Sequence, residues 1–400
     1  VLRAYDLERL QIGPEYLIPK PFDPRVLWRV APAVARAAME EGLARNPIED
    51  FDVYVTSLQT RFRASHELIN AITTRAMEHP KQIVYPHADD VRMIRAARRV
   101  LDEGIAKPIL LGDASRIEAL ADDAGISLGG IDVIDPIEED AERERYAVVL
   151  EQLRRHKGLS LQTARKLIED PDMYACLMVR EGRADAVIGG LTTNYPETIR
   201  PALQVLQVEE GRSIVSSVYL VVIRGTPYFF TDCAVNIEPT AEQLAEIALA
   251  ATTTAEEDFS RDPRVAFISY SDFGSAGGSE PARVRRAVEL FRLARPDVPV
   301  DGEMQADTAV MPELLADRRP SGPLTRPANV LVFPNLTAAN ASYKLLNRLG
   351  DAEVIGPIIS GLSKTVHVLQ RDASVTDVVN MTAIAVAEAQ RRERTASTQG

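Results

Sequence analysis

Residues 355–380 read Ile-Gly-Pro-Ile-Ile-Ser-Gly-Leu-Ser-Lys-Thr-Val-His-Val-Leu-Gln-Arg-Asp-Ala-Ser-Val-Thr-Asp-Val-Val-Asn. The pair Gly356-Pro357 interrupts the chain and predicts the start of a short apolar strand. The polar triplet Gln370-Arg371-Asp372 predicts a loop, and Ser374 with Asp377 three residues later is typical of a helix N-terminus with a capping box. An arginine before such a helix, with a carboxylate in its first turn, offers a place for an anion and a proton acceptor. A well-capped surface helix with an incidental arginine has the same pattern, so both interpretations stay open on these residues alone.

Short apolar runs alternate with helical stretches through most of the chain. The runs that predict strands are residues 82–86, 108–112, 131–134, 186–190, 265–270, 298–302 and 328–333. Such runs between helices favour parallel sheets that helices cover on both faces. Residues 212–222 and 228–232 differ, because Gly225-Thr226-Pro227 between them predicts a hairpin. We therefore expect an α/β fold with one subdomain from residues 51–205 and 351–395 and a second from residues 206–350.

The bulk composition is that of a globular protein. The chain has 400 residues, of which 46% are hydrophobic, enough for about two or three cores. Its formal net charge of −12 argues against non-specific binding to nucleic acid or to an anionic membrane. Cys176 and Cys233 are the only cysteines and the five histidines are scattered, so we expect neither a disulfide framework nor a metal site. No apolar run reaches membrane-spanning length, and we expect no signal peptide and a cytoplasmic location.

The stretch from Gly361 to Asn380 resembles the C-terminal signature of phosphate acetyltransferases (phosphotransacetylases). In that family a Ser-Arg pair stands where this chain has Gln370-Arg371, and the catalytic aspartate falls on Asp377. The resemblance implies that the arginine holds the charge of acetyl phosphate and that the aspartate accepts the thiol proton of coenzyme A. This chain keeps the arginine and the aspartate but not the serine. Because glutamine is too long to mimic a small hydroxyl in a tight site, we expect a degenerate, non-catalytic site.

Two further stretches resemble family motifs that line the active cleft. Residues 189–202 join a strand end to a helix start and finish in Arg-Pro-Ala, as in the family. The resemblance therefore implies that Thr192 and Arg200 contact the ligand. Residues 230–236 contain the family's Asp-Cys-Ala-Val-Asn, so Cys233 is expected to line the cleft without a covalent role.

The Gly/Ser-rich loop 269–281 resembles the family loop beside the coenzyme A site. It gives Ser275 as a candidate ligand contact, although Phe273 and Gly274 stand where the family often has a lysine. Residues 301–307 resemble the acidic family motif Asp-Gly-Glu-(Leu/Met)-Gln-x-Asp. We expect a solvated or capping acidic turn there rather than a metal site.

The first 50 residues have a different texture. Residues 12–25 are proline-rich and predicted to be extended, a helix is predicted for 32–44, and residues 46–50 read as a linker. Alone, this segment would be typical of a disordered or docking arm. Its Pro-Lys-Pro-Phe-Asp-Pro-Arg run, however, resembles the end of the nucleotide-binding domain of bacterial malic enzymes. Long bacterial malic enzymes carry a phosphotransacetylase-like module after that domain, so we expect this chain to be part of a longer protein.

Together, the resemblances imply two α/β/α subdomains with a cleft between them, as in isocitrate and isopropylmalate dehydrogenases. They imply a homo-oligomer through residues 206–350. We expect a domain that senses acetyl-CoA and regulates an N-terminal malic enzyme part, which would use NADP and a divalent metal. The alternatives are an active phosphate acyltransferase that moves acetyl between coenzyme A and phosphate, and a scaffold for oligomerisation alone. Neither nucleic acid nor a membrane is an expected partner.

Overall fold

The computed structural model describes residues 29–193 and 195–399, apart from the side chains of residues 56–67 and 396–399. The chain divides into two compact units, residues 1–67 with 222–226 and residues 68–221 with 227–400. In the first unit, α1 (Ala31–Glu40) overlaps the helix predicted for residues 32–44. The guanidinium of Arg36 lies 4.7 Å from the centre of the Phe51 ring. The Oδ1 atom of Asp50 accepts the first free amides of α2 (Phe51–Glu78). The proline-rich prediction for residues 12–25 lies outside the described residues.

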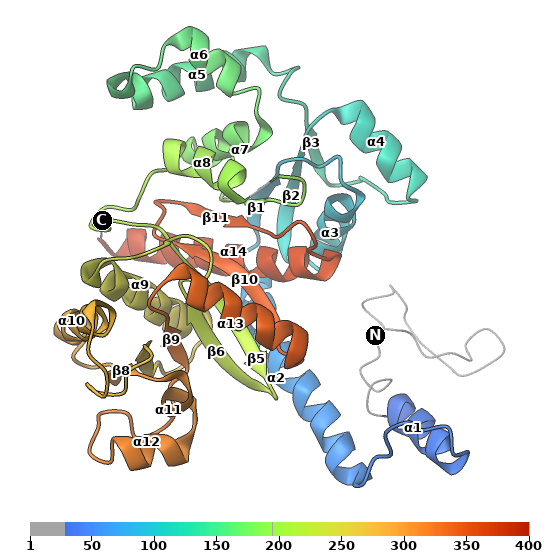
Figure 1. Ribbon diagram of the computed structural model, residues 1–400. Helices are drawn as coiled ribbons and strands as arrows, with labels where there is room; N and C mark the ends of the chain where they lie inside the picture. Colours follow the sequence, from blue (N-terminus) through green and yellow to red (C-terminus); the bar gives the residue numbers. More distant parts are fainter. Residues whose placement is uncertain (1–28, 194, 400) are drawn as a thin grey trace. The chain divides into compact units, whose positions relative to one another are not determined.

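The second unit contains a five-stranded parallel sheet (Figure 1). Its order is β11-β4-β1-β2-β3, formed by Thr365–Val368, Ala186–Gly189, Lys81–Tyr85, Ala106–Leu111 and Asp132–Ile134. Every neighbouring pair is parallel, with Ile83 opposite both Pro108 and Ala186, and His367 opposite Ile188. The strands are nearly continuous apolar runs because helices cover both faces. The parallel α/β prediction is confirmed for this part of the chain.

Helices lie on both sides of this sheet. They are α3 (Val91–Asp102), α4 (Ala114–Asp123), α5 (Asp140–Arg154), α6 (Leu161–Leu167), α7 (Pro171–Arg180), α8 (Tyr195–Val205) and α14 (Val375–Gln399). Helix α3 packs against α14, and α7 packs against α8. In Figure 1 the sheet lies between these two pairs. The apolar faces of the helices and the sheet thus form a single core on each side.

A second sheet has six strands in the order β10-β5-β6-β9-β7-β8. They are Glu353–Ser360, Ser216–Ile223, Thr226–Thr231, Val330–Val332, Val265–Ile268 and Val300–Met304. The predicted hairpin is confirmed, because β5 and β6 are neighbours joined at Arg224-Gly225. Around this sheet lie α9 (Ala241–Thr253), α10 (Ser279–Ala294), α11 (Ala306–Val310), α12 (Pro312–Arg318) and α13 (Leu336–Leu349). Thr240 and Gln243 form the capping box of α9.

Two features of the C-terminal half differ from the predictions. Gly356-Pro357 does not start a strand but lies inside β10, which begins at Glu353. Gly356 has φ +148°, and a Cβ there would lie 2.8 Å from a ring carbon of Tyr219 on β5. Glycine is therefore required for the two strands to pack at this point, rather than to break the chain. Helix α13 was not predicted at all, although it borders the cavities described below.

The chain crosses between the two sheets near its end. Strand β10 hydrogen-bonds into the second sheet, whereas β11 joins the first. Residues 361–364, which link β10 to β11, therefore pass from one sheet to the other. The exact subdomain boundaries stay a prediction. The loop that follows β11 is consequently placed where the two sheets approach each other.

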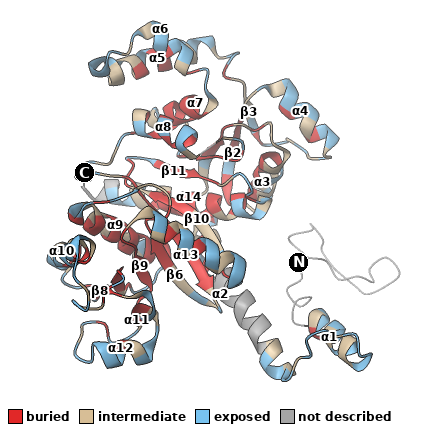
Figure 2. Cartoon of the chain, in the orientation of Figure 1, coloured by how far each residue is buried: buried red, intermediate tan, exposed pale blue. Residues whose placement is uncertain are grey.

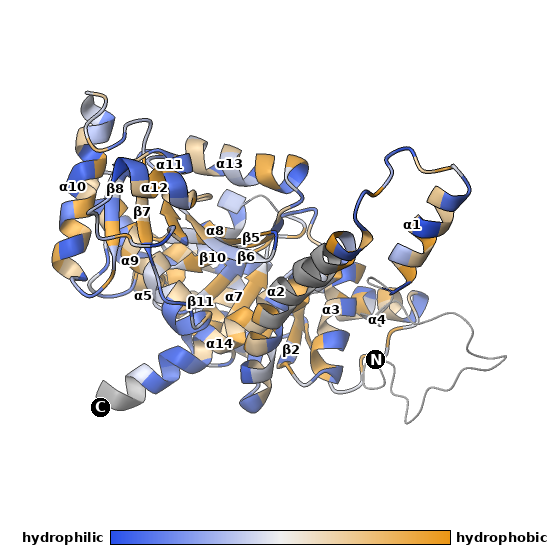
Figure 3. Cartoon of the chain, turned by 90° about the horizontal axis from the view of Figure 1, so that it is seen from below, coloured by the Kyte–Doolittle hydropathy of each residue, from blue (hydrophilic) through white to orange (hydrophobic). Residues whose placement is uncertain are grey.

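Buried residues concentrate in both sheets and in the helix faces turned toward them (Figure 2). Figure 3 shows hydrophobic segments, in orange, at strands such as β2 and β7. One buried ionic group ties α14 to the first sheet: Glu388 is 2% exposed and lies 3.4 Å from His367 Nε2 and 2.8 Å from Arg392 Nε. Burial by itself would raise the pKa of Glu388, but Arg392, His367 and Arg391 lower it below the ordinary value. Among the residues the structure describes, no helix is long and apolar enough to span a membrane.

Candidate functional site

The site lies at the carboxyl edge of the first sheet, where β1, β4 and β11 end side by side. Parallel strands end at the same edge, and the loops that follow them form the usual ligand-binding crevice of such sheets. His87 follows β1, Gly190 follows β4 and Gln370 follows β11. The backbone N–H of Leu369 donates to the carbonyl oxygen of Gly189 at 2.8 Å. The loops after β4 and β11 therefore start side by side.

Gly190 allows the loop after β4 to pass against the loop after β11. Its φ is +101°, and a Cβ atom there would overlap the carbonyl oxygen of Leu369. No other residue fits this position without moving one of the two loops. The close approach brings Arg371 to the β4 loop, where its Nε lies 3.4 Å from the carbonyl oxygen of Thr193.

Arg92 on α3 holds the backbone of the Gln370-Arg371-Asp372 loop. Its Nη1 donates to the carbonyl oxygens of Arg371 and Ala373, both at 2.9 Å. Its other nitrogens are fixed by Asp90, with Nη2 2.7 Å from Oδ2. Bidentate pairing of this kind orients the guanidinium as well as binding it. Arg92 is therefore a positioning residue for the loop, which the motif search did not find.

Gln370 is joined to two tyrosines of the second sheet and α13. Its Nε2 donates to the hydroxyl of Tyr219 at 3.0 Å and to that of Tyr343 at 3.2 Å. The two tyrosine rings stack with centroids 4.4 Å apart and an interplanar angle of 17°. Burial, followed by the neighbouring Tyr343, raises the pKa of Tyr219. Tyr219 therefore keeps its proton near pH 7, and Gln370 is held in place against the stacked tyrosines.

Two cavities lie on either side of Gln370. The first, called here the Arg371 cavity, has a volume of about 390 Å³ and is lined by Thr193, Tyr195, Pro196, Tyr219, Cys233, Ala234, Asn340, Tyr343, Lys344, Pro357, Leu369, Gln370 and Arg371. The second, the Asp377 cavity, has a volume of about 260 Å³ and is lined by Tyr219, Tyr343, Lys344, Asn347, Arg348, Val354, Ile355, Gly356, Leu369, Gln370, Asp372, Ala373, Asp377 and Met381. Gln370 and the Tyr219–Tyr343 pair line both. Arg371 and Asp377 thus line different cavities.

Asp377 forms the predicted capping box at the start of α14. Its Oδ2 accepts from the backbone N–H and the hydroxyl of Ser374, both at 2.8 Å, and its own N–H donates to the Ser374 hydroxyl at 3.2 Å. The capping prediction is confirmed. One carboxylate oxygen of Asp377 is therefore engaged in capping the start of α14.

Cys233 lies at the end of β6 and lines the Arg371 cavity. The thiol is buried, and burial followed by the charge of Asp232 raises its pKa well above the ordinary value. A thiol with a raised pKa is a poor nucleophile. This supports the prediction that Cys233 has no covalent role.

The other predicted contacts do not line the two cavities. Arg200 and Thr192 are exposed and line neither cavity, although Thr193 does. Ser275 is exposed in the Gly/Ser loop, where its hydroxyl accepts the N–H of Asp272 at 2.9 Å. The structure therefore brings together Gln370, Arg371 and Cys233, and it places Asp377 in the adjoining cavity.

The acidic stretch 301–307 is not a solvated turn as predicted. Asp301 and Glu303 lie in β8 and are 1% and 0% exposed. Glu303 Oε1 accepts from Ser271, Gly274 and Arg285, and so fastens the Gly/Ser loop to the sheet. Alternation along the strand turns both carboxylates inward. Within the described residues, no group of three or more His, Cys, Asp or Glu side chains is placed to hold a metal ion.

Comparison with known proteins identifies the family of this chain. Residues 67–386 match the sequence model of the family described as Phosphate acetyl/butaryl transferase. The chain belongs to this family. The phosphate acetyltransferase of Clostridium acetobutylicum is 35% identical over 331 residues, which cover 81% of this chain and 99% of that protein. A phosphotransacetylase structure from Streptococcus pyogenes has a TM-score of 0.76 and 34% identity, covering 82% of this chain and 99% of that one. A phosphotransacetylase from Staphylococcus aureus gives a TM-score of 0.74 at 32% identity, covering 81% of this chain and 98% of that one.

A second group of relatives extends beyond the transferase family. The NADP-dependent malic enzyme of Escherichia coli (strain K12) is 39% identical over 395 residues, 98% of this chain and 52% of that enzyme. The NAD-dependent malic enzyme of Rhizobium meliloti is 35% identical over 391 residues, 96% of this chain and 50% of that enzyme. The chain spans about half the length of the curated malic enzymes that it matches. The N-terminal residues outside the transferase match are therefore shared with malic enzymes.

The sequence reading missed the side chains that α13 and β5 contribute to the cavities. Tyr219, Tyr343, Lys344 and Arg348 stand in no motif that we identified. The sequence offered no signal for these residues beyond the adjacent aromatic and basic side chains of Tyr343-Lys344. The Lys344 ammonium lies 5.3 Å from the centre of the Tyr343 ring.

His87 is paired with Asp172 rather than with the neighbouring Asp89 and Asp90, and this pair gives a pH prediction. His87 Nε2 lies 3.2 Å from the buried Oδ2 of Asp172. Burial alone would lower the pKa of His87, but the hydrogen bond and charge of Asp172, with Asp170 and Asp89, raise it. A histidine whose pKa is raised in the folded state stabilises the fold fully at pH values below its unfolded pKa of about 6.5. That contribution to the unfolding free energy is lost as the pH rises through the folded-state pKa.

We expect the unfolding free energy to fall between about pH 6.5 and the raised pKa of His87. His87→Asn should remove this component, and asparagine tolerates the φ of 58° at this position. Urea unfolding at several pH values from 6 to 9 measures the slope for both proteins. An equal slope in the variant would show that other groups cause the pH dependence.

Proposed function

We propose that this chain is a ligand-sensing domain that binds acetyl-CoA without turning it over, and that it regulates a malic enzyme part of the same protein. The observation that supports it is Gln370. In the family a serine precedes the arginine, whereas here a glutamine stands there, bonded to both tyrosine hydroxyls and lying between the two cavities. A reaction that needs the arginine and the aspartate around one acyl group is not favoured when each lines a different cavity.

Binding is supported by the character of the Arg371 cavity. Its volume of about 390 Å³ falls in the ordinary range for small-molecule sites. Arg371 and Lys344 border it with positive charge, while tyrosines, prolines and Leu369 supply apolar surface. A polyanion that ends in a small acyl group matches this combination. The overall charge of −12 makes these local cations necessary.

The malic enzyme part of the proposal is supported by the matches that span nearly the whole chain. It implies NADP and a divalent metal in the part of the protein that precedes this chain, and a homo-oligomer formed through residues 206–350. An active acyltransferase is the second candidate. It is favoured by the retention of Arg371 and Asp377 and by relatives named phosphate acetyltransferase that match over nearly their full length.

Two measurements test the proposal. Calorimetric titration of this chain with acetyl-CoA should show saturable binding, and acetyl-CoA formation from acetyl phosphate should be absent or very slow. Addition of acetyl-CoA should then change the malate oxidation rate of the full-length protein, whereas this chain alone with malate, NADP and a divalent metal should reduce no NADP.

The possible outcomes separate the candidates. Transfer at on the order of 10 per second, a normal enzymatic rate, would establish the acyltransferase instead. An absence of both binding and transfer would leave an oligomerisation scaffold.

A further inference from the structure

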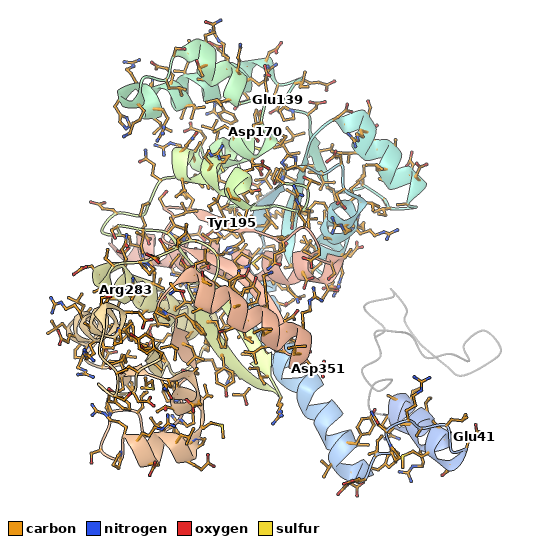
Figure 4. All side chains as sticks on the ribbon, in the orientation of Figure 1. Glu41, Glu139, Asp170, Tyr195, Arg283 and Asp351 are labelled. Atoms are coloured by element: carbon orange, nitrogen blue, oxygen red, sulfur yellow. The ribbon has the colours of Figure 1, made fainter. Side chains whose placement is uncertain are left out.

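Tyr195 is a partly buried tyrosine that lines the Arg371 cavity, and its hydroxyl oxygen is buried. It stands at the start of α8, directly after the loop that Arg371 contacts. It lines the cavity together with Cys233 and Ala234. Figure 4 labels it between the helices around the first sheet and those around the second. Among the residues that the structure describes, none forms a hydrogen bond with its buried hydroxyl oxygen.

One candidate partner, Asp232, is already saturated. Asp232 is buried, and its charge acts on the Tyr195 hydroxyl. Its two oxygens accept hydrogen bonds from the backbone and hydroxyl of Ser217, from the backbone of Ala234, Val235 and Asn236, and from the side chain of Asn236. This network ends β6 and shapes the turn that carries Cys233. The carboxylate therefore has its lone pairs engaged and does not accept from Tyr195.

The hydroxyl is a donor under all ordinary conditions. Burial, followed by the charge of Asp232, raises the pKa of Tyr195, so the proton stays on the oxygen near neutral pH. A buried donor without an acceptor costs free energy in the ligand-free protein. A ligand that brings an acceptor recovers that cost, and it meets little competition from water.

The acceptor that suits this position is neutral. The negative charge of Asp232 that acts on the hydroxyl disfavours an anionic oxygen, such as one of a phosphoryl group, more than a carbonyl oxygen. The cations Arg371 and Lys344 line the same cavity and are available for the anionic part of the ligand. The cavity thus offers different polar groups to the charged and to the uncharged parts of a thioester.

We propose that the Tyr195 hydroxyl donates a hydrogen bond to the acyl carbonyl oxygen of the bound thioester, and that this contact makes the site prefer acyl-CoA over free coenzyme A. The inference rests on the proposed function, because it assigns one residue of the same site to one group of the ligand. It predicts a specificity that the cations alone do not supply, since acetyl-CoA and coenzyme A carry the same phosphates.

The test compares Tyr195→Phe with the unaltered chain in titrations with acetyl-CoA, coenzyme A and acetyl phosphate. The variant should bind acetyl-CoA about three- to ten-fold more weakly, the effect of one neutral hydrogen bond, while its affinity for coenzyme A stays unchanged. Melting temperatures give a second readout that is independent of the titrations. Without ligand the variant should melt at least as high as the unaltered chain, because a buried unpaired donor is gone, yet saturating acetyl-CoA should raise its melting temperature less.

Tyr146→Phe is the matched control. It removes the hydroxyl of a buried tyrosine, which packs against Tyr174 at a centroid distance of 5.0 Å and lines neither cavity. Its affinities for acetyl-CoA and coenzyme A should match those of the unaltered chain.

Equal weakening of acetyl-CoA and coenzyme A by Tyr195→Phe, or no change in either, would overturn the inference and leave the sensing function standing. A stronger effect on acetyl phosphate than on acetyl-CoA would also overturn it, because the partner would then be a phosphoryl oxygen. A failure of the unaltered chain to bind acetyl-CoA would overturn both this inference and the proposed function.

Discussion

Gln370→Ser is expected to raise the rate of acetyl-CoA formation from acetyl phosphate and coenzyme A by about 10²–10³-fold, the usual contribution of one positioned hydrogen-bonding group. Gln370 reaches the hydroxyls of Tyr219 and Tyr343 at 3.0 and 3.2 Å and lines both cavities. A serine side chain is too short to make those bonds. The Arg371 and Asp377 cavities should then join, with the family's hydroxyl restored beside Arg371.

Gln370→Ala is the control for this prediction. It shortens the side chain equally and opens the same space, but it supplies no hydroxyl, so its transfer rate should stay near that of the unaltered chain. The rates come from a continuous thioester absorbance assay at saturating substrates. If serine and alanine give the same rate, then the hydroxyl does not limit transfer, and the capping of Asp377 by Ser374 is the more important obstacle.

Arg371→Ala is expected to weaken acetyl-CoA binding by roughly 1.5 kcal/mol, the lower end of the range for a hydrogen bond to a charged group. That corresponds to about a ten-fold rise in Kd. The lower end applies because Arg371 is exposed, and solvent therefore screens its charge. Its guanidinium remains well placed, since Arg92 holds its backbone and Thr193 lies 3.4 Å from its Nε.

Arg200→Ala is the matched variant for Arg371→Ala. Both changes remove one exposed arginine and the same net charge, but Arg200 lines neither cavity. The sequence motif gave the two arginines equal weight, whereas the structure predicts a clearly smaller effect for Arg200. Isothermal titration at two salt concentrations distinguishes a direct contact from a long-range effect, because only the latter is largely screened. Equal losses for both variants would place the ligand outside the Arg371 cavity.

Local sequence patterns predicted much of the secondary structure. The four strands predicted at 82–86, 108–112, 131–134 and 186–190 occur within two residues of those positions. The hairpin at Gly225 and the capping box at Ser374 were also correct. These features depend on neighbours a few residues apart, through side-chain alternation, turn conformation and the free amides of a helix end. The arrangement of motifs likewise indicated the family, to which the chain belongs.

Long-range packing decided what local patterns could not. The inward direction of Asp301 and Glu303, the pairing of His87 with Asp172, and the hold of Arg92 on the 371–373 backbone all join residues far apart in the sequence. Gly356 shows the difference most clearly. Its sequence context predicts a chain break, yet its missing side chain serves the contact between β10 and Tyr219.

The sequence by itself determined much of the order of strands and helices, though not α13, as well as the family and the replacement of a serine by Gln370. The tertiary structure alone decided that Gln370 lines both the Arg371 cavity and the Asp377 cavity, and that α13 borders both. It also decided that the Tyr195 hydroxyl is buried without a hydrogen-bond partner among the described residues. The physical reason is that secondary structure follows from interactions within a few residues, whereas a cavity is the space left between elements that meet only when the whole chain has packed.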